Sequence, residues 1–529
     1  MQIRFDGALP YPSQRQPLFA RNVVATSQPL AAQAGLAMLA RGGNAIDAAI
    51  ATAIALTVVE PTTNGIGSDL FAIVWDGEKL IGLNASGRSP AAWSHERFAS
   101  RDVMPTYGWD AVTIPGAVAG WSALSQRFGE LPFEDLFEPA IRYARDGFQV
   151  AATISALWQR AAKVLPHDLG FAEHFLPAGR APEAGELFRC ASMAETLMAI
   201  AKTHGNAFYR GHLAAAMVAH AEANQGAHTL EDFAAHTVDW VAPITMRYRD
   251  LDVHEIPPNG QGIAALMALA MLRDFDLASL SPDSVASQHL CIEAMKLAFA
   301  DAHAFVTDAN AMTMSPRALL DADYLSQRAR LIDGNRAQQF SAGRPPSGGT
   351  VYLATGDARG RMVSLIQSNY MGFGAGVVVP GTGISLQNRG HGFSLTRGHP
   401  NIVEGNKRPF HTIIPGFVTH EGKPLAAFGV MGGAMQPQGH VQTITRLADH
   451  RMNAQAVLDA PRWRSNGGLA LDLELTADAS LHEGLAALGH RITVPGDRLG
   501  FGCGQFVVKI DDGYMAGSDP RRDGYPVGF

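Results

Sequence analysis

One run of the sequence, residues 45–59, constrains the fold more than any other. It reads AIDAAIATAIALTVV, is rich in alanine and carries a single charge at Asp47. Residues 29–59 as a whole predict two helices separated at Gly42-Gly43, and this run is the second of them. A helix that is apolar on most of its sides is buried between layers, and this one is too short to span a bilayer. The sequence therefore predicts a layered fold with this helix inside it.

The rest of the chain divides into a helix-rich part and a strand-rich part. Apolar runs on both sides of Asp76-Gly77 predict a β-hairpin. Helical patterns dominate from about 115 to 330, for example over 133–146 and 284–305. Strand-like runs and further helices follow residue 350, at 351–355, 362–368, 413–418, 425–430 and 504–510 for the strands and at 438–449 and 453–459 for the helices. This distribution predicts an α+β sandwich with sheets inside and helices outside.

Composition limits the class of partner. The 529 residues would fill two to four average domains or one large layered domain, and 47% of them are hydrophobic, which excludes a disordered chain. The net charge is −7 with scattered Lys and Arg, so we expect no nucleic acid and no membrane surface as partner, but a small molecule. The start of the chain lacks an apolar core of signal-peptide length, so we expect a cytoplasmic protein.

Several common catalytic and cofactor signatures are missing from the sequence. There is no G-x-S-x-G, H-E-x-x-H, Walker A loop or complete G-x-G-x-x-G. The three cysteines form no CxxC pair, and the 19 histidines show no metal-ligand spacing. We therefore expect neither a metal nor an organic cofactor.

Thr350 is the candidate nucleophile. The polar segment 335–349 ends in Gly348-Gly349 and runs directly into an apolar strand that begins with Thr350. A threonine hydroxyl becomes reactive when a base takes its proton, and an N-terminal threonine carries that base as its own α-amine. This chemistry requires cleavage between Gly349 and Thr350, which an exposed, glycine-containing segment permits. The alternative is an ordinary strand residue that follows a flexible loop.

The hairpin geometry adds a second candidate. If the segment 356–360, GDARG, turns tightly between two strands, residue 350 lies opposite residue 367 or 368. Ser368 would then be able to hydrogen-bond the amine or hydroxyl of Thr350.

Seven stretches spread over the chain carry a family resemblance: GGNAIDAAIA, TIPGAVAGW, ARDGF, PPNGQG, NKRPF, GVMGG and SDPR. The sequence resembles the γ-glutamyltransferase family of N-terminal-nucleophile hydrolases. The resemblance implies a four-layer αββα sandwich and self-cleavage before a threonine in a T-x-x-x-x-x-x-D-x-x-G pattern, here Thr350, Asp357 and Gly360. It implies a large subunit of residues 1–349 and a small subunit of residues 350–529 from one precursor. The number of such units in the assembly stays open, and a dimer of heterodimers is one of the alternatives.

The resemblance also assigns roles to individual residues. It implies that the backbone amides of Gly432 and Gly433 form the oxyanion hole, which glycine permits because both amides can approach the developing charge. Ser368 matches the family's second threonine, which supports the nucleophile. The alternative for the two glycines is a simple turn.

The residues that the resemblance places in the substrate pocket depart from the family pattern. Ser86 stands where the family has the arginine for an α-carboxylate, with Arg88 two residues on, and Gly392 stands where it has the aspartate for an α-amino group. The other departures are Arg389 for a neutral donor, Tyr370 for an asparagine, and His411-Thr412 for a serine pair.

Loss of the aspartate removes the means of recognising an α-amino acid, while the added arginines favour a compact anion. Either Arg88 or Arg389, or both, would bind the anion; the alternative for each is a surface or interdomain ion pair.

The departures resemble the acylase-like branch of the family. They imply an amidohydrolase that cleaves the amide of a small anion such as oxamate and releases ammonia. The alternatives are a γ-glutamyl hydrolase or transferase, a β-lactam acylase, and an uncleaved protein that binds a small anion without catalysis.

Overall fold

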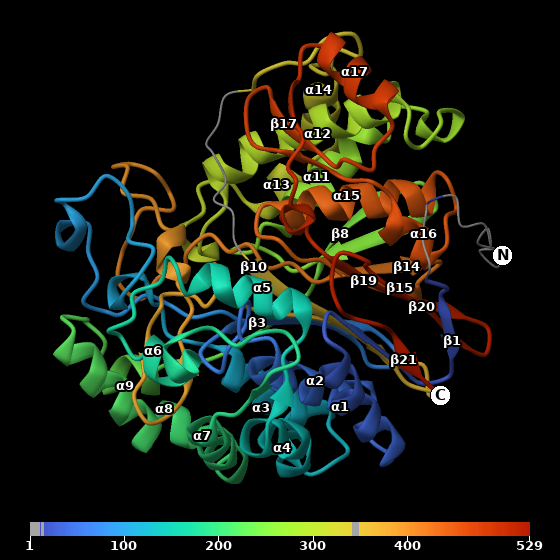
Figure 1. Cartoon of the computed structure of the whole chain (residues 1–529). Helices are drawn as coiled ribbons and strands as arrows, with labels where there is room; N and C mark the ends of the chain where they lie inside the picture. The colour runs from blue at the N-terminus through green and yellow to red at the C-terminus, as the bar shows by residue number, and fades with distance from the viewer. Residues whose placement is uncertain (1–10, 12–14, 341–348) are drawn as a thin grey trace.

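A computed structural model describes residue 11 and residues 15–340 and 349–529, with the backbone alone for 349–351 (Figure 1). Two seven-stranded sheets lie face to face at its centre. The first sheet has the order β1 (Leu18–Ala20), β20 (Gly513–Ser518), β19 (Gly504–Ile510), β15 (Lys423–Val430), β14 (Gly416–His420), β9 (Leu251–Glu255) and β8 (Ile244–Tyr248). The second has the order β21 (Val527–Gly528), β2 (Val23–Thr26), β10 (Gly349–Gly356), β11 (Met362–Tyr370), β3 (Asp69–Trp75), β4 (Leu80–Ala85) and β7 (Asp239–Val241).

The two sheets share an apolar core. It contains side chains from both inner faces, among them Phe71, Tyr352, Ile366, Phe417 and Val507. Alternate residues of a strand point to opposite faces, so each strand also contributes side chains to the helix layer behind it.

One helix layer covers the second sheet. It contains α1 (Pro29–Ala40), α2 (Ala45–Val59), α3 (Ala117–Phe128), α4 (Glu138–Asp146) and α7 (Ala191–Lys202), which pack into a single core with the outer face of the sheet. Every residue of α2 is buried, and Asn44 and Asp47 form a capping box at its start. The two helices predicted over 29–59 and the burial of the second one are confirmed.

A second helix layer covers the first sheet, on the opposite side of the molecule (Figure 1). It contains α11 (Gly262–Leu272), α12 (Val285–Phe305) and α15 (Met435–Ala448). The layers follow the order αββα, as the family resemblance implied.

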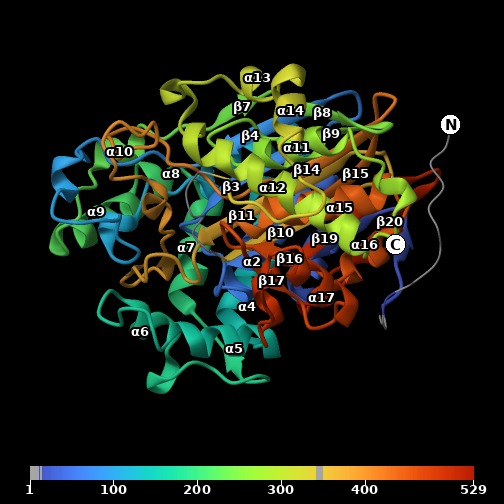
Figure 2. The ribbon, with the colours of Figure 1, turned by 90° about the horizontal axis from the view of Figure 1, so that it is seen from above.

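Shorter helices complete the fold. They are α5 (Ala152–Ala161), α6 (Phe171–Phe175), α8 (Asn206–Tyr209), α9 (His212–Ala223), α10 (Leu230–Ala234), α13 (Pro316–Leu319), α14 (Ala322–Ala329), α16 (Ala454–Asp459) and α17 (Ala479–Ala487). The remaining strands form small sheets: β5 (Phe148–Gln149) with β6 (Leu187–Phe188), β12 (Val378–Val379) with β13 (Ile384–Ser385), and β16 (Trp463–Ser465) with β17 (Ala470–Leu473) and β18 (Arg491–Thr493). Seen from above, α5 and α6 extend from one side of the sandwich (Figure 2). Among the helices described, none is long and apolar enough to cross a membrane.

The chain segments before and after Thr350 are interleaved in both sheets. In the second sheet, β10 pairs with β2 on one side and with β11 on the other, and β11 pairs with β3. In the first sheet, β14 pairs with β9. The helix-rich and strand-rich portions therefore build one unit. Most of the polar segment predicted over 335–349 lies outside the described residues.

Candidate active site

The register of β10 and β11 sets the position of Thr350. Gly349 pairs with Tyr370 and Val351 pairs with Gln367, with a register shift between them. The backbone of Thr350 therefore lies next to Ser368, in agreement with the predicted hairpin. The side chain of Thr350 is outside the described part of the structure. The Ser368 hydroxyl is buried and accepts a hydrogen bond from the Tyr370 amide at 2.7 Å.

Gly432 and Gly433 form the turn between β15 and α15. Their φ angles are +122° and +61°, in the region that favours glycine. A Cβ on Gly432 would lie 3.1 Å from Met435 Cβ and 3.2 Å from Gly502 Cα, so there is little room for any side chain. Within the described residues, neither glycine amide donates to a backbone carbonyl. Two neighbouring N–H groups before a helix are thus available to an oxygen that carries negative charge.

Gln261 connects this turn to the rest of the site. Its side-chain amide donates to the carbonyl of Gly433 at 2.9 Å and to the carbonyl of Thr412 at 2.6 Å. The sequence reasoning did not assign a role to Gln261, although it lies in the family-like stretch PPNGQG.

Arg389 lies in the middle of the site with most of its guanidinium unsatisfied. It begins a short 3₁₀ helix, Arg389–Gly392, and is 1% exposed. Its Nη1 donates to Thr412 Oγ1 at 2.7 Å, and its Cζ lies 4.7 Å from the centre of the Tyr370 ring. Its Nε and Nη2 have no hydrogen-bond partner among the described residues, and it forms no ion pair with any described carboxylate. Burial lowers the pKa of Arg389 to about 10, so it remains a cation near neutral pH.

Tyr370 places a second unsatisfied group beside this guanidinium. It ends β11 with φ +78°, a conformation that non-glycine residues adopt mainly at constrained sites. Its hydroxyl is buried and has no partner in the described part of the chain. Burial raises the pKa of Tyr370, so the hydroxyl is a neutral donor.

A buried carboxylate that the sequence reasoning missed, Asp69, holds His411. Asp69 begins β3 and pairs with Ser368 across the sheet. Its Oδ1 accepts hydrogen bonds from the amides of Gly87 at 3.3 Å and Gly116 at 3.0 Å, and its Oδ2 accepts one from His411 Nε2 at 3.1 Å. The only signal in the sequence is an acid at the start of a long apolar strand.

His411 is a neutral imidazole with a fixed tautomer. Its Nδ1 accepts a hydrogen bond from the Ile413 amide at 3.3 Å, so the proton is on Nε2, facing Asp69. Burial, together with the nearby Arg389, lowers the pKa of His411 to about 4.

Arg88 and Ser86 have other partners. Arg88 Nη1 forms an ion pair with Asp308 at 2.7 Å and donates to the carbonyl of Asn406 at 3.1 Å, and its side chain is 37% exposed. Ser86 Oγ donates to Asn84 Oδ1 at 2.7 Å. The two arginines therefore differ: Arg88 has the ion pair considered as its alternative role, and Arg389 has no such pair.

Gly392 leaves the site without the family's acidic side chain. Its carbonyl accepts a hydrogen bond from Asn401 Nδ2 at 2.7 Å. A Cβ at this position would lie 2.8 Å from the Phe410 carbonyl oxygen, so the backbone leaves little room for an aspartate here without rearrangement.

The αββα sandwich, with a threonine strand in its second sheet and a glycine turn after β15 of the first, is the fold of the N-terminal-nucleophile hydrolases. A sequence model described as gamma-glutamyltranspeptidase matches residues 31–529, and the chain belongs to this family.

Three relatives show where the chain stands within the family. It is 37% identical to the glutathione hydrolase-like YwrD proenzyme of Bacillus subtilis, over 96% of this chain and 98% of that protein. It is 34% identical to the oxamate amidohydrolase proenzyme of Klebsiella pneumoniae, over 94% and 97% of the two chains. The crystal structure of cephalosporin acylase from Bacillus halodurans superimposes with a TM-score of 0.94 and 47% identity, over 100% of this chain and 99% of that one. The chain is thus a hydrolase whose relatives are made as proenzymes.

Proposed function

We propose that the chain cuts itself before Thr350 and that the mature enzyme hydrolyses the amide of a small carboxylate-bearing substrate such as oxamate. The products of the cut are residues 1–349 and 350–529. The proenzyme names of two relatives and the position of Thr350 at the start of β10 support the cut.

In the proposed reaction, Thr350 Oγ attacks the amide carbonyl carbon, and the α-amine of Thr350 takes the hydroxyl proton. The amides of Gly432 and Gly433 donate to the oxyanion, for which the unused N–H groups of this turn are suited. The amine returns the proton to the leaving nitrogen, so that ammonia departs and an ester to Thr350 remains. Water then cleaves the ester and restores the threonine. Ser368, adjacent in the sheet, supports the nucleophile.

The observation that carries the choice of substrate is the unsatisfied guanidinium of Arg389. An unpaired buried cation is costly to the fold, and its free Nε and Nη2 present two parallel donors, the geometry that matches a carboxylate. Tyr370 adds a third donor beside it. Thr412 positions this guanidinium through its hydroxyl. We assign His411, Ser86 and Arg88 to the polar residues around the substrate.

The same site argues against an α-amino group in the substrate. Asp69 is the carboxylate that acts electrostatically on Arg389, and its oxygens already accept three hydrogen bonds. An ammonium group would have to share these oxygens with His411 and the two glycine amides and would lie near the Arg389 cation, which disfavours γ-glutamyl compounds.

Two measurements test the proposal. On denaturing gels the mature protein should give two bands near two-thirds and one-third of the chain, and sequencing of the smaller band should begin T-V-Y-L-A. Ammonia release should be faster from oxamate than from oxamide, which has the same amide but no carboxylate. Thr350→Ala should abolish both the cut and the turnover. An uncut chain with full activity, or equal turnover of the two amides, would refute the proposal.

A β-lactam acylase is the second candidate, because the solved acylase covers the whole chain at 47% identity. Release of a side chain from a cephalosporin at a rate above that for oxamate would favour it. Release of p-nitroaniline from a γ-glutamyl anilide at such a rate would instead favour γ-glutamyl hydrolysis.

A further inference from the structure

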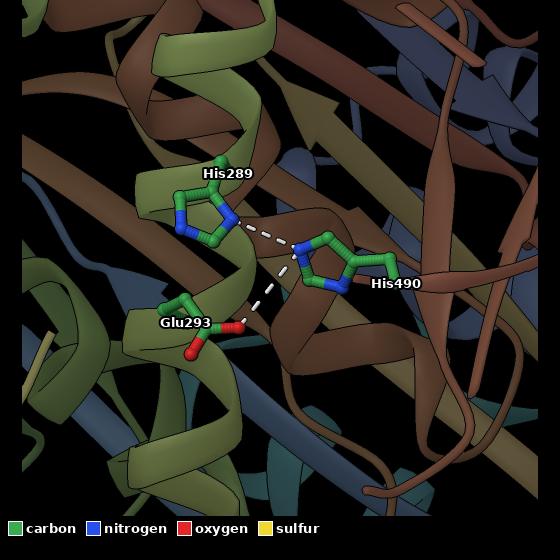
Figure 3. A group of neighbouring side chains, drawn as sticks. All are labelled: His289, Glu293 and His490. Carbon is green, nitrogen blue, oxygen red and sulfur yellow. Dashed lines mark hydrogen bonds and ion pairs between the residues drawn. The ribbon is translucent and has the colours of Figure 1, made fainter. Parts of the chain in front are cut away.

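A second group of buried polar side chains lies in the helix layer over the first sheet, apart from the residues described above. His289 and Glu293 are four residues apart on α12, on one face of the helix, and His490 lies in the connection between α17 and β18 (Figure 3). His289 Nδ1 is 2.9 Å from His490 Nε2, which is 3.9 Å from Glu293 Oε1. All three side chains are buried, and these three atoms lie within 4.8 Å of one another.

The backbone around 333–338 orients two of these side chains. His289 Nε2 donates to the carbonyl of Asp333 at 2.9 Å, so its proton is on Nε2 and its Nδ1 lone pair faces the other two residues. Glu293 Oε2 accepts from the Gln338 amide at 3.1 Å, so Oε1 is the oxygen turned inward. Metal-binding histidines and carboxylates are held in this way, by backbone groups on the atom that does not bind the metal.

We propose that His289, Glu293 and His490 form a binding site for a divalent transition-metal ion of the Zn²⁺ type. Two imidazole nitrogens and one carboxylate oxygen are a donor set that Zn²⁺ accepts, with a fourth position left for water. A tetrahedral ion about 2.0–2.1 Å from each nitrogen would hold the nitrogens roughly 3.3 Å apart. The two rings must therefore separate by a few tenths of an ångström, and His490 must carry its proton on Nδ1.

No spacing in the sequence indicates this site, because His490 is 201 residues from His289.

Lys296 competes for the site. Its Nζ donates to Glu293 Oε1 at 2.6 Å, and it is itself buried. A metal ion on Glu293 must share or displace this ammonium, and two cations beside one carboxylate repel each other. The lysine therefore weakens metal binding, and its removal should strengthen it, which a purely structural hydrogen-bond network would not predict.

The site connects the two halves of the chain. His289 and Glu293 precede Thr350, and His490 follows it. If the chain is cut as proposed above, a metal ion at this site is bound by residues of both subunits and holds them together. Metal binding itself does not depend on the cut, so its measurement is independent of the proposed function.

The experiment uses tag-free, full-length protein that is stripped with EDTA, dialysed and titrated with Co²⁺, whose visible absorption reports a four-coordinate site. We expect one Co²⁺ per chain, displaced by one Zn²⁺, and a higher melting temperature with metal. His490→Gln and Glu293→Gln should weaken Zn²⁺ binding by roughly 10-fold or more. His482→Gln, a histidine of the neighbouring helix α17, is the matched control and should bind as the wild type does.

The direction in which Lys296→Met changes the affinity for Zn²⁺ is the most informative result. This variant should bind Zn²⁺ about 10-fold more tightly than the wild type, because it removes the competing charge. Failure of both the wild type and Lys296→Met to bind one metal ion per chain would overturn the proposal. Equal affinity of wild type and His490→Gln would also overturn it. The wild-type and Lys296→Met titrations stand even if the other variants fail to fold.

Discussion

Arg88 and Arg389 carry the same charge in the same region, and their different partners determine what each is expected to do. Arg88 is neutralised by Asp308. Arg389 is buried with two N–H groups unused in the described structure, an arrangement that lowers stability and so calls for a ligand. Arg389→Met should therefore leave the thermal midpoint unchanged or higher, while kcat/KM for oxamate falls by about 30- to 150-fold, the equivalent of 2–3 kcal/mol.

Arg389→Lys keeps the positive charge but lacks the planar guanidinium with its parallel N–H donors. Its activity should lie between those of the wild type and Arg389→Met. Steady-state kinetics on oxamate and oxamide, with thermal melts of the three proteins, make the comparison. An equal loss on both amides would show that Arg389 supports the fold rather than the substrate.

Asp69 is the residue whose neutralisation should disturb the site most. In Asp69→Asn, an amide –NH₂ would face either His411 Nε2–H or the amides of Gly87 and Gly116, so at least one buried donor loses its acceptor. Such a loss costs about 1–3 kcal/mol of unfolding free energy. Urea titration should show this as a lower midpoint at constant m-value.

Asp252→Asn is the matched control for Asp69→Asn. This aspartate forms a partly exposed ion pair with Arg247 at 3.0 Å. Its loss should cost less than about 1 kcal/mol. Equal effects of the two substitutions would mean that the hydrogen bonds of Asp69 contribute no more than a surface contact.

At the scale of elements, the β10–β11 hairpin is fixed to the start of α2 by the turn residue Asp357. Its Oδ2 accepts from the Ala45 amide at 3.0 Å, and its Oδ1 accepts from the Arg359 amide at 2.9 Å and the Arg361 amide at 3.2 Å. A carboxylate at a helix N-terminus is favoured by the helix dipole. Asp357→Ala should lower the free energy of unfolding by about 2–3 kcal/mol. It should also slow the appearance of the two bands on gels, because Thr350 lies near the start of this hairpin.

Asp76→Ala is the control for Asp357→Ala, because it removes an aspartate from the turn of the β3–β4 hairpin. Asp76 caps only its own exposed turn, through the amides of Glu78 and Lys79. We expect a loss near 0.5–1 kcal/mol and no change in cleavage. Slower cleavage in Asp76→Ala but not in Asp357→Ala would contradict the anchoring role.

The elements also show what the sequence can and cannot predict. Strong local patterns sufficed for α2, for the β3–β4 hairpin and for the strand at 504–510, which coincides with β19. The helix predicted over 133–146 is instead a 3₁₀ segment, Phe133–Phe137, followed by α4, because Pro139 in its first turn lacks an N–H and restarts the helix. Asp69 and His411 are 342 residues apart and meet only when strand and loop assemble, so no local pattern could pair them.

At the scale of the whole molecule, burial makes the fold sensitive to acid. Burial lowers the pKa of five histidines to about 3 or 4; they are His228, His236, His254, His411 and His490. In the unfolded chain the same groups titrate near 6.5. Below that pH the unfolded state binds more protons than the folded state, so the stability present above pH 6.5 is lost as pH falls through 4.

His254 isolates one such contribution far from the proposed nucleophile. It lies in β9, with its ring nitrogens 2.8 Å from the Thr245 hydroxyl and 2.9 Å from the Thr419 hydroxyl. Its pKa is about 4 in the fold against a usual 6.5, which corresponds to about 3 kcal/mol once the pH is below both values. Between pH 7.5 and 4.5, His254→Gln should lose about 2 kcal/mol less unfolding free energy than the wild type.

Burial raises the pKa values of Glu60 and Glu255, so these carboxyls act in the opposite direction. They are common to both proteins and cancel in the comparison. Urea titrations of wild type and variant at each pH give the difference directly. Parallel losses in the two proteins would mean that the fold does not lower the pKa of His254, and that the acid sensitivity of the sandwich comes from its other buried groups.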